Sequence, residues 1–125
     1  METVLIDTNI IVGHLRKDPA ANSAIARMDG YTFVICDAVL AEVLAGSRNQ
    51  AEFDRLHSEL TSNFHILPFT MEVSGYFREI VRTTARERGI HFADYLIAAT
   101  ALAHDCPLLT LNKKHFTPIN GLKLA

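Results

Sequence analysis

Short apolar runs alternate with longer amphipathic segments along the whole chain. The apolar runs predict strands, and the first of them, at residues 3–6, predicts a buried strand because both of its faces are apolar. They cover residues 3–6, 31–36, 64–69 and 108–111, and a short run at 122–124 would add a fifth strand. Between these runs, apolar positions recur at the spacing of an α-helix. The predicted helices cover residues 10–15, 20–28, 38–45, 49–62, 71–88 and 92–104.

Capping and turn residues indicate where several of these elements begin and end. The pair Asp18–Pro19 is expected to break the helix predicted over residues 10–15. Asp37 is a natural N-cap for the helix predicted over residues 38–45. Thr70 can cap the long helix that Gly89 ends. Pro68 places the third strand near an edge of the sheet, because proline has no N–H to donate. Strands that alternate with helices predict one α/β domain over residues 1–125, built on a mainly parallel sheet of four or five strands.

Composition narrows the class of protein. The 125 residues are 49% hydrophobic and 21% charged, with a net charge of −2, which is typical of a globular protein and excludes a highly basic nucleic-acid coat protein. Cys36 and Cys106 lie too far apart in the sequence for a zinc knuckle or a disulfide scaffold. No apolar run approaches the roughly 20 residues of a membrane span, and the acidic start is unlike a secretory signal. We therefore expect a soluble cytoplasmic protein with no membrane partner.

Asp7 is the first candidate for chemistry, because it follows the first predicted strand directly. In open parallel sheets, ligands bind outside the carboxyl ends of the strands. An Asp at this position can equally cap the next helix. Thr8 and Asn9 are also capping residue types, so the local sequence leaves both roles open.

Glu42 and Asp94 are isolated acids in apolar helices. Glu42 is the single charged residue within Ala38–Gly46, and a buried, unpaired carboxylate would require a compensating cation. The alternative is a glutamate that points into solvent. Asp94 is the single acid of residues 91–103 and lies in a first helical turn, where the helix dipole also favours an anion. Together with Asp7, these acids indicate a metal site.

Four motifs occur in the order found in PIN domains, namely Ile6–Asn9, Ala41–Gly46, Phe92–Ala99 and Leu109–Phe116. Through these motifs the chain resembles, over residues 3–124, the VapC-type toxins of bacterial and archaeal toxin–antitoxin pairs. The resemblance implies a PIN-like three-layer α/β/α sandwich. It also implies ribonuclease activity that depends on Mg²⁺ or Mn²⁺.

The resemblance further implies roles for single residues. Asp7, Glu42 and Asp94 match the three main metal-binding acids of the family, with Asp7 and Asp94 holding the ion directly and Glu42 reaching a metal-bound water. Thr110 matches a hydroxyl that touches such a water or a phosphate. Asn112 stands where many relatives have an Asp, and an amide can coordinate through its oxygen but contributes no charge. Whether a second ion binds therefore stays open.

The implied reaction is hydrolysis of an RNA phosphodiester by metal-activated water, which requires no Ser, Cys or His nucleophile. The implied partners are a tRNA or rRNA substrate, an antitoxin protein and a second copy of the chain in a homodimer. Basic side chains could line a phosphate-binding rim, although the same residues are also typical of solvated helix faces. They are Arg48, Arg82, Arg86, Arg88, Lys113 and Lys114.

Two other classes of protein share features with this sequence. A phospho-acceptor receiver domain has a similar length and also binds Mg²⁺, but it needs an acceptor Asp at a mid-chain strand end. Residues 55–68 contain no Asp, and no Lys-Pro pair follows Leu111, which disfavours this class. A PIN-like module that binds RNA or protein without cutting is favoured by Asn112 and opposed by the three acids.

Overall fold

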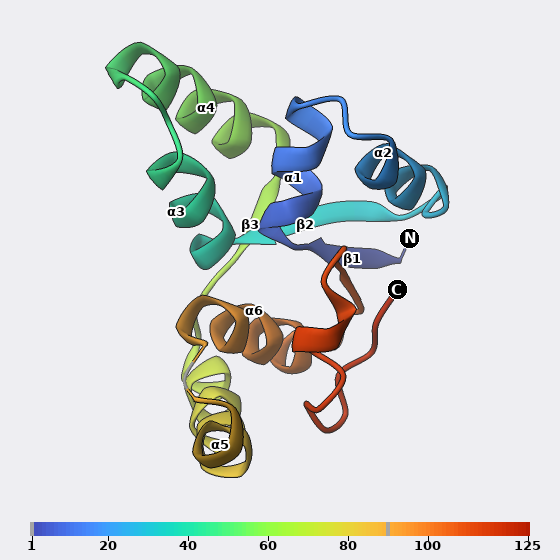
Figure 1. The fold of residues 1–125 in the computed structure, drawn as a ribbon, viewed down its shortest axis with the longest axis vertical. Coiled ribbons are helices and arrows are strands. Elements are labelled where there is room, and N and C mark those ends of the chain that lie inside the picture. The colour runs from blue at the N-terminus through green and yellow to red at the C-terminus, as the bar shows by residue number, and fades with distance from the viewer. Residues whose placement is uncertain (1, 90) are drawn as a thin grey trace.

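A computed structural model describes residues 2–89 and 91–125 of the chain (Figure 1). In this part of the chain the strands are β1 (Thr3–Ile6), β2 (Thr32–Cys36), β3 (His65–Leu67) and β4 (Leu108–Leu109). The helices are α1 (Thr8–Leu15), α2 (Pro19–Ala26), α3 (Asp37–Ala45), α4 (Gln50–Asn63), α5 (Met71–Arg88), α6 (Phe92–Ala103) and the short 3₁₀ helix η1 (Lys113–His115). The alternation of strands and helices follows the sequence prediction.

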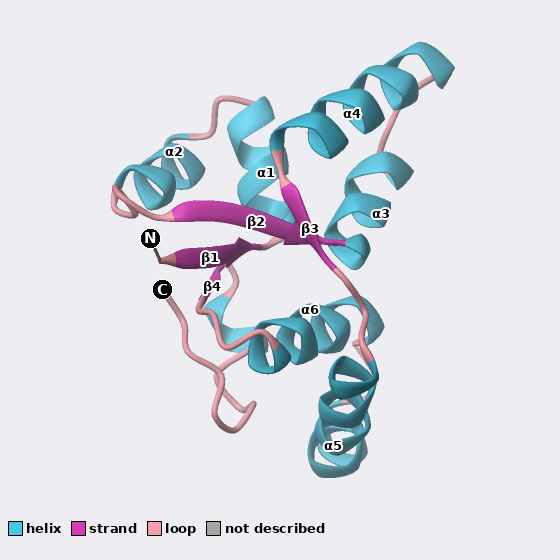
Figure 2. Ribbon diagram, turned by 180° about the vertical axis from the view of Figure 1, so that it is seen from behind, coloured by secondary structure: helices cyan, strands magenta, loops and turns pink. Residues whose placement is uncertain are grey.

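The four strands form one parallel sheet in the order β3-β2-β1-β4 (Figure 2). The predicted α/β fold with a parallel sheet is confirmed, and β3, followed by Pro68, is an edge strand as predicted. The strand expected at residues 122–124 is absent from the described structure, where Leu124 makes a single parallel bridge to Leu108. β4 is also shorter than predicted, because it ends at Leu109. Thr110 follows the strand, and its hydroxyl donates to the Asp7 carboxylate.

Helices cover both faces of the sheet and make three layers (Figure 1). α1, α2 and α4 lie on one face, and α5 and α6 pack together on the other. α3 follows β2 directly and contacts both α1 and α6. α3 therefore stands at the carboxyl edge of the sheet, between the two helical layers.

The starts of α2 and α3 differ from the prediction. Asp18 is the N-cap of α2, where its side chain accepts a backbone N–H, and Pro19 occupies the first turn of that helix. The pair therefore begins α2, because proline fits the start of a helix, where its missing N–H costs no bond. Asp37 lies inside the first turn of α3, and Cys36 holds the N-cap position without a side-chain cap bond. Asp37 thus supports α3 through its charge at the positive end of the helix.

The ends of α5 agree with the prediction. The Thr70 hydroxyl accepts the Val73 N–H at 3.2 Å, which caps the helix. Gly89 has φ +77°, a backbone conformation that favours glycine, and it ends the helix.

The core is centred on β1, whose Val4 and Leu5 are fully buried. Cys36 and Cys106 are free and buried, and removal from water raises the pKa of both thiols. Among the described residues, none of the helices combines the length and apolar character that crossing a membrane requires.

Candidate functional site

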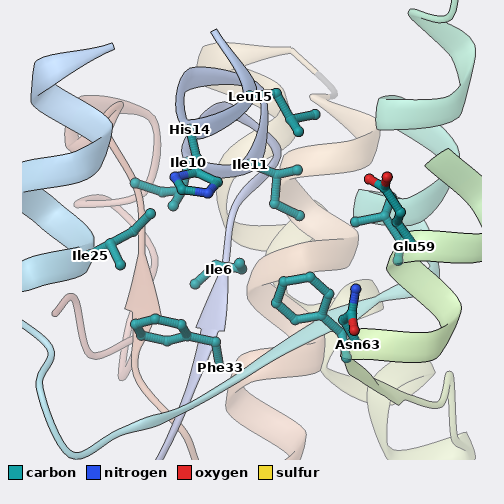
Figure 3. Close-up of a pocket in the computed structure, with 11 residues that line it drawn as sticks. Ile6, Ile10, Ile11, His14, Leu15, Ile25, Phe33, Glu59 and Asn63 are labelled. Carbon is teal, nitrogen blue, oxygen red and sulfur yellow. The ribbon is translucent and has the colours of Figure 1, made fainter. Parts of the chain in front are cut away.

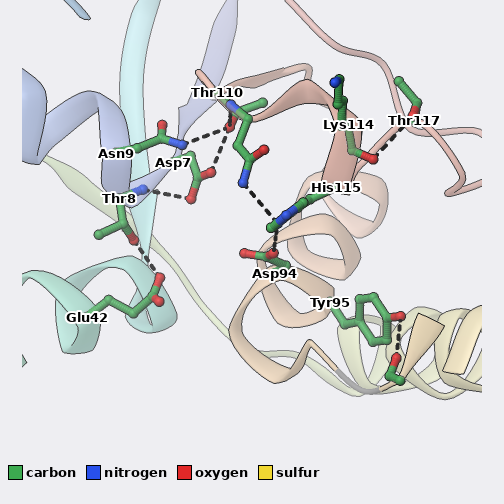
Figure 4. A network of polar contacts seen from close by, with 12 residues as sticks. Asp7, Thr8, Asn9, Glu42, Asp94, Tyr95, Thr110, Lys114, His115 and Thr117 are labelled. Atoms are coloured by element: carbon green, nitrogen blue, oxygen red, sulfur yellow. Dashed lines mark hydrogen bonds and ion pairs between the residues drawn. The ribbon is translucent and has the colours of Figure 1, made fainter.

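Asp7 lies directly after β1, at the carboxyl edge of the sheet (Figure 4). Its backbone N–H donates to the Leu109 carbonyl at 2.9 Å, which ties the end of β1 to β4. One carboxylate oxygen accepts the Thr8 N–H at 2.7 Å and caps α1, and the other accepts the Thr110 hydroxyl at 2.8 Å. Asp7 is therefore a helix cap whose carboxylate also lies where the sheet presents ligands.

The Asp7 residue is only 4% exposed. Removal from water raises the pKa of its carboxyl group, and the negative charges of Asp94 and Glu42 raise it further. The hydrogen bonds from Thr110 and Thr8 oppose these effects, but the net shift is upward. Asp94 and Glu42 thus lie near enough to Asp7 to disfavour its negative charge, and a cation beside Asp7 would relieve that repulsion.

Glu42 reaches the site from α3, where its Oε1 accepts the Thr8 hydroxyl at 2.6 Å (Figure 4). Of the two alternatives that the sequence left open for Glu42, a buried carboxylate and one that points into solvent, the structure shows the second, because Glu42 is exposed. α3 packs on the core through a different face, which carries Val39 and Val43. The small residues beside Glu42 make this face of α3 apolar, but they do not cover the Glu42 carboxylate.

Asp94 enters from the first turn of α6, and its side chain is 24% exposed. His115, in η1, places its Nδ1 atom 3.0 Å from Asp94 Oδ2. The same ring nitrogen lies 2.9 Å from Asn112 Nδ2. Sequence reasoning gave His115 no role, since its only signal was its position three residues after Asn112.

Thr110 is buried and its hydroxyl uses every bond that it can form. The hydroxyl donates to Asp7 and accepts hydrogen bonds from Asn9 Nδ2 at 3.3 Å and from the Asn112 N–H at 3.0 Å. A hydroxyl has one hydrogen and two lone pairs. In this arrangement Thr110 orients Asp7, whereas the resemblance gave it contact with a metal-bound water or a phosphate.

The side chains at this edge suit a small, hard divalent cation. The oxygens of Asp7, Glu42 and Asp94 are the donors that Mg²⁺ and Mn²⁺ prefer. Within residues 2–89 and 91–125, no Lys or Arg forms an ion pair with any of the three. No three His, Cys, Asp or Glu side chains of the described residues are grouped closely enough to hold an ion together. Mg²⁺ needs only one or two carboxylates besides water and substrate phosphate, so the donor set fits it.

A polar groove adjoins Glu42 between α1, α3 and α4, with a volume of about 480 Å³. Arg16, Arg48 and Arg55 line it. Arg48 forms an ion pair with Glu52 at 2.6 Å, while its side chain remains 82% exposed. The groove thus places arginine side chains beside Glu42, which is one of the three acids of the candidate site.

A second pocket, of about 380 Å³, lies between the sheet and helices α1, α2 and α4 (Figure 3). Its walls are mostly apolar and include Ile10, Ile11, Ile25 and Phe33. Glu59 and Asn63 of α4 form the polar side of the pocket. It lies on the helical layer opposite α5 and α6.

Comparison with known proteins gives a family match over most of the chain. The model of the PIN domain family matches residues 4–120. Ribonuclease VapC19 of Mycobacterium tuberculosis is 38% identical over 118 residues, which cover 90% of this chain and 90% of that protein. Ribonuclease VapC of Rickettsia bellii is 32% identical over 130 residues, which cover 97% of this chain and 93% of that protein.

Solved structures share the same fold. The crystal structure of VapBC2 from Rickettsia felis bound to a DNA fragment from their promoter matches with a TM-score of 0.80 and 28% identity, over 98% of this chain and 97% of that chain. The structure of VapBC-1 from nontypeable Haemophilus influenzae matches with a TM-score of 0.80 and 25% identity, over 98% and 96%. These matches confirm the expected PIN-like α/β/α arrangement.

Proposed function

We propose that this chain, which belongs to the PIN-domain family, is a metal-dependent endoribonuclease and the toxin of a toxin–antitoxin pair. One observation carries the proposal. At the carboxyl edge of the sheet, the charges of Glu42 and Asp94 act on the buried Asp7 carboxylate and raise its pKa, and no Lys or Arg of the described residues forms an ion pair with any of the three. Such an arrangement suits an ion that stabilises a phosphodiester during hydrolysis.

Asp7 and Asp94 are the residues that would hold Mg²⁺ or Mn²⁺ directly, with Glu42 reaching a water on the ion. When bound, the ion would supply an activated water and neutralise charge on the phosphate. The other side chains hold these oxygens in place. Thr110 fixes one oxygen of Asp7, and Thr8 fixes one oxygen of Glu42.

Cationic side chains near the acids support RNA, a polyanion, as the substrate. Lys113 and Lys114 lie in η1, on the segment that carries His115. Arg16 and Arg48 line the polar groove that reaches Glu42. We expect these side chains to bind phosphates on both sides of the scissile bond of a structured RNA, a tRNA or an rRNA.

The partner that we propose for the apolar pocket of Figure 3 is a segment of the antitoxin. The similar structures from Rickettsia felis and Haemophilus influenzae are VapBC complexes, and an apolar pocket suits the apolar side of a peptide. Leu15→Glu, at a rim residue that is 46% exposed, should weaken binding of the antitoxin encoded beside this chain's gene. Phe53→Glu is the matched control, since Phe53 is 37% exposed on α4 and lies outside the pocket. Equal loss in both variants would contradict this docking site.

A second copy of the chain is the other partner that we propose. Phe69, Met71 and Phe92 expose 44%, 90% and 64% of their surface, and they lie just before α5, at the start of α5 and at the start of α6, two helices that pack together. Exposed apolar side chains of this kind are typical of surfaces that bind another protein. Light scattering of the purified chain should give the mass of two copies, and a monomer at all concentrations would contradict the homodimer.

The proposed activity is tested by incubating the purified chain with structured RNA. We expect cleavage with Mg²⁺ or Mn²⁺, none with EDTA, and cleavage that is about 1000-fold slower with Asp7→Asn. Cleavage that persists in excess chelator would contradict the metal mechanism. Binding of RNA without cleavage in either metal would identify the chain as a binding module.

A further inference from the structure

The segment from Thr110 to His115, which follows β4, contacts both acids that would hold the ion directly (Figure 4). Thr110 donates to Asp7 Oδ2 at 2.8 Å, and His115 Nδ1 lies 3.0 Å from Asp94 Oδ2. Phe116, the next residue, is 1% exposed and anchors the segment in the core. Two carboxylates that are far apart in the sequence are therefore tied to one short segment.

The contact at Asp94 is a hydrogen bond that the imidazole ring donates. A ring nitrogen has one bonding position, so Nδ1 cannot accept from Asn112 and donate to Asp94 at once. A carboxylate is a stronger hydrogen-bond acceptor than an amide, and a lone pair on Nδ1 would repel the Asp94 carboxylate oxygen. Nδ1 therefore carries a hydrogen directed at Asp94. An Asn112 amide turned by 180° would place its oxygen, in place of its NH2 group, beside that N–H, where it shares the hydrogen as a weaker second acceptor.

The imidazole ring is also held in its orientation. His91 stacks on it, with ring centroids 5.5 Å apart and planes 27° apart. Tyr95 contacts His91 edge-on, with centroids 6.0 Å apart. Tyr95 is 2% exposed, and its hydroxyl donates to the Gly89 carbonyl at 2.8 Å. The stack thus extends from the rim of the site to the core, and a neutral ring is sufficient for the bond to Asp94.

We propose that His115 is a positioning residue, which holds the Asp94 carboxylate in the orientation that binds the divalent ion. The inference rests on the proposed function and names a residue that controls its metal site. His115 makes the one side-chain hydrogen bond to Asp94 within residues 2–89 and 91–125. Loss of such a partner typically lowers metal affinity about 10- to 100-fold.

Four variants separate the hydrogen bond from the ring. His115→Asn keeps a donor where Nδ1 stood and removes the ring, whereas His115→Phe keeps the ring and removes the donor. His91→Ala removes the stack and leaves the donor in place. His57→Ala is the matched control, an exposed histidine on α4 outside the site. Thermal melting in EDTA checks that each variant is folded, and His115, with a side chain 47% exposed, should tolerate both changes.

Calorimetric titration of the whole chain with Mn²⁺ measures the effect directly. We expect His115→Phe to bind Mn²⁺ about 10- to 100-fold more weakly, and His115→Asn and His57→Ala to stay close to wild type. His91→Ala should fall between them. A His115→Phe chain with wild-type affinity, or a His115→Asn chain as weak as His115→Phe, would overturn the inference and leave the proposed function standing. A wild-type chain that binds no Mn²⁺ would overturn both.

Discussion

The candidate site has a buried half and an exposed half, and the two are held in place differently. Asp7 and Thr110 form the buried half, with 4% and 3% exposure, at the ends of β1 and β4. Glu42, which is exposed, and Asp94, whose side chain is 24% exposed, form the more accessible half, called the exposed half, and come from helices α3 and α6. Asp7 accepts two hydrogen bonds, one on each oxygen, whereas Glu42 and Asp94 each have one side-chain partner in the described structure.

The difference separates stability from activity. A buried carboxylate costs free energy of desolvation, and its hydrogen bonds are part of the fold. An exposed carboxylate costs little, because water can replace a lost partner. Changes around Asp7 should therefore alter both unfolding and cleavage, while changes around Glu42 and Asp94 should alter mainly metal binding and cleavage.

The largest effect should follow substitution of the buried acid itself. Asp7→Asn removes the charge of a residue that we propose as a direct metal ligand, and it should lower the rate of RNA cleavage about 1000-fold, which corresponds to about 4 kcal/mol of lost transition-state stabilisation. Asn112→Ala, the control, should cost about tenfold or less, because Asn112 bonds to His115 and to no acid in the described structure. Single-turnover cleavage in Mg²⁺ measures both. An Asn112→Ala loss as deep as that of Asp7→Asn would place Asn112 among the main ligands.

The next effect compares one substitution in each half. Thr110→Val removes the hydroxyl donor from the buried Asp7 carboxylate and should lower the free energy of unfolding by about 1–3 kcal/mol. Thr8→Val removes the donor from the exposed Glu42 and should cost less than about 1 kcal/mol. Urea denaturation at pH 7 in EDTA gives both values. Equal costs would show that burial does not distinguish the two halves.

A smaller effect concerns the pH dependence of stability. Burial raises the pKa of Asp7, so the folded chain binds that proton more tightly than the unfolded chain does. Asp7 makes its full contribution to the free energy of unfolding at low pH, and this contribution is lost as pH rises through the raised pKa. In EDTA, the stability of Asp7→Asn relative to wild type should therefore be on the order of 1 kcal/mol more favourable at pH 7 than at pH 3, because the neutral amide escapes this loss. A gap that widens toward acid would contradict the upward direction.

The smallest effect is expected at Asp94. Asp94→Asn removes one charge from the repelling acids, so in EDTA the variant should be at least as stable as wild type, within a few tenths of a kcal/mol. With saturating Mg²⁺ the order should reverse, because wild type gains the free energy of ion binding. Thermal melts in both buffers give the comparison. If Asp94→Asn is less stable than wild type by the same margin in EDTA and in Mg²⁺, Asp94 acts only as a favourable charge at the N-terminus of α6.

Local patterns predicted the buried half of the site well. An apolar run followed by Asp7 marks the carboxyl end of a strand, and the parallel sheet then sets where that side chain lies. The same reasoning placed β3 at an edge, because Pro68 follows it. Strand pattern and topology are enough in these cases, because the parallel pairing of β1 and β4 brings Asp7 and Thr110 together at one edge of the sheet, although they are far apart in the sequence.

The exposed half depends on contacts between distant residues, and the sequence predicted it less well. The exposure of Glu42 depends on which face of α3 packs on the core, which its uniformly apolar neighbours do not reveal. His115 reaches Asp94 only because η1 folds back over the start of α6. The predicted N-cap role of Asp37 is wrong, because Cys36 occupies the N-cap position one residue earlier.

The central claim is that the carboxyl edge of the sheet binds a divalent ion through Asp7. Calorimetric titration of Mn²⁺ into wild type and into Asp7→Asn, at equal pH and protein concentration, tests this claim most directly. We predict a saturable site in wild type and an affinity at least about 100-fold lower in the variant, because the direct ligand has lost its charge. Equal affinity in the two proteins would contradict the account.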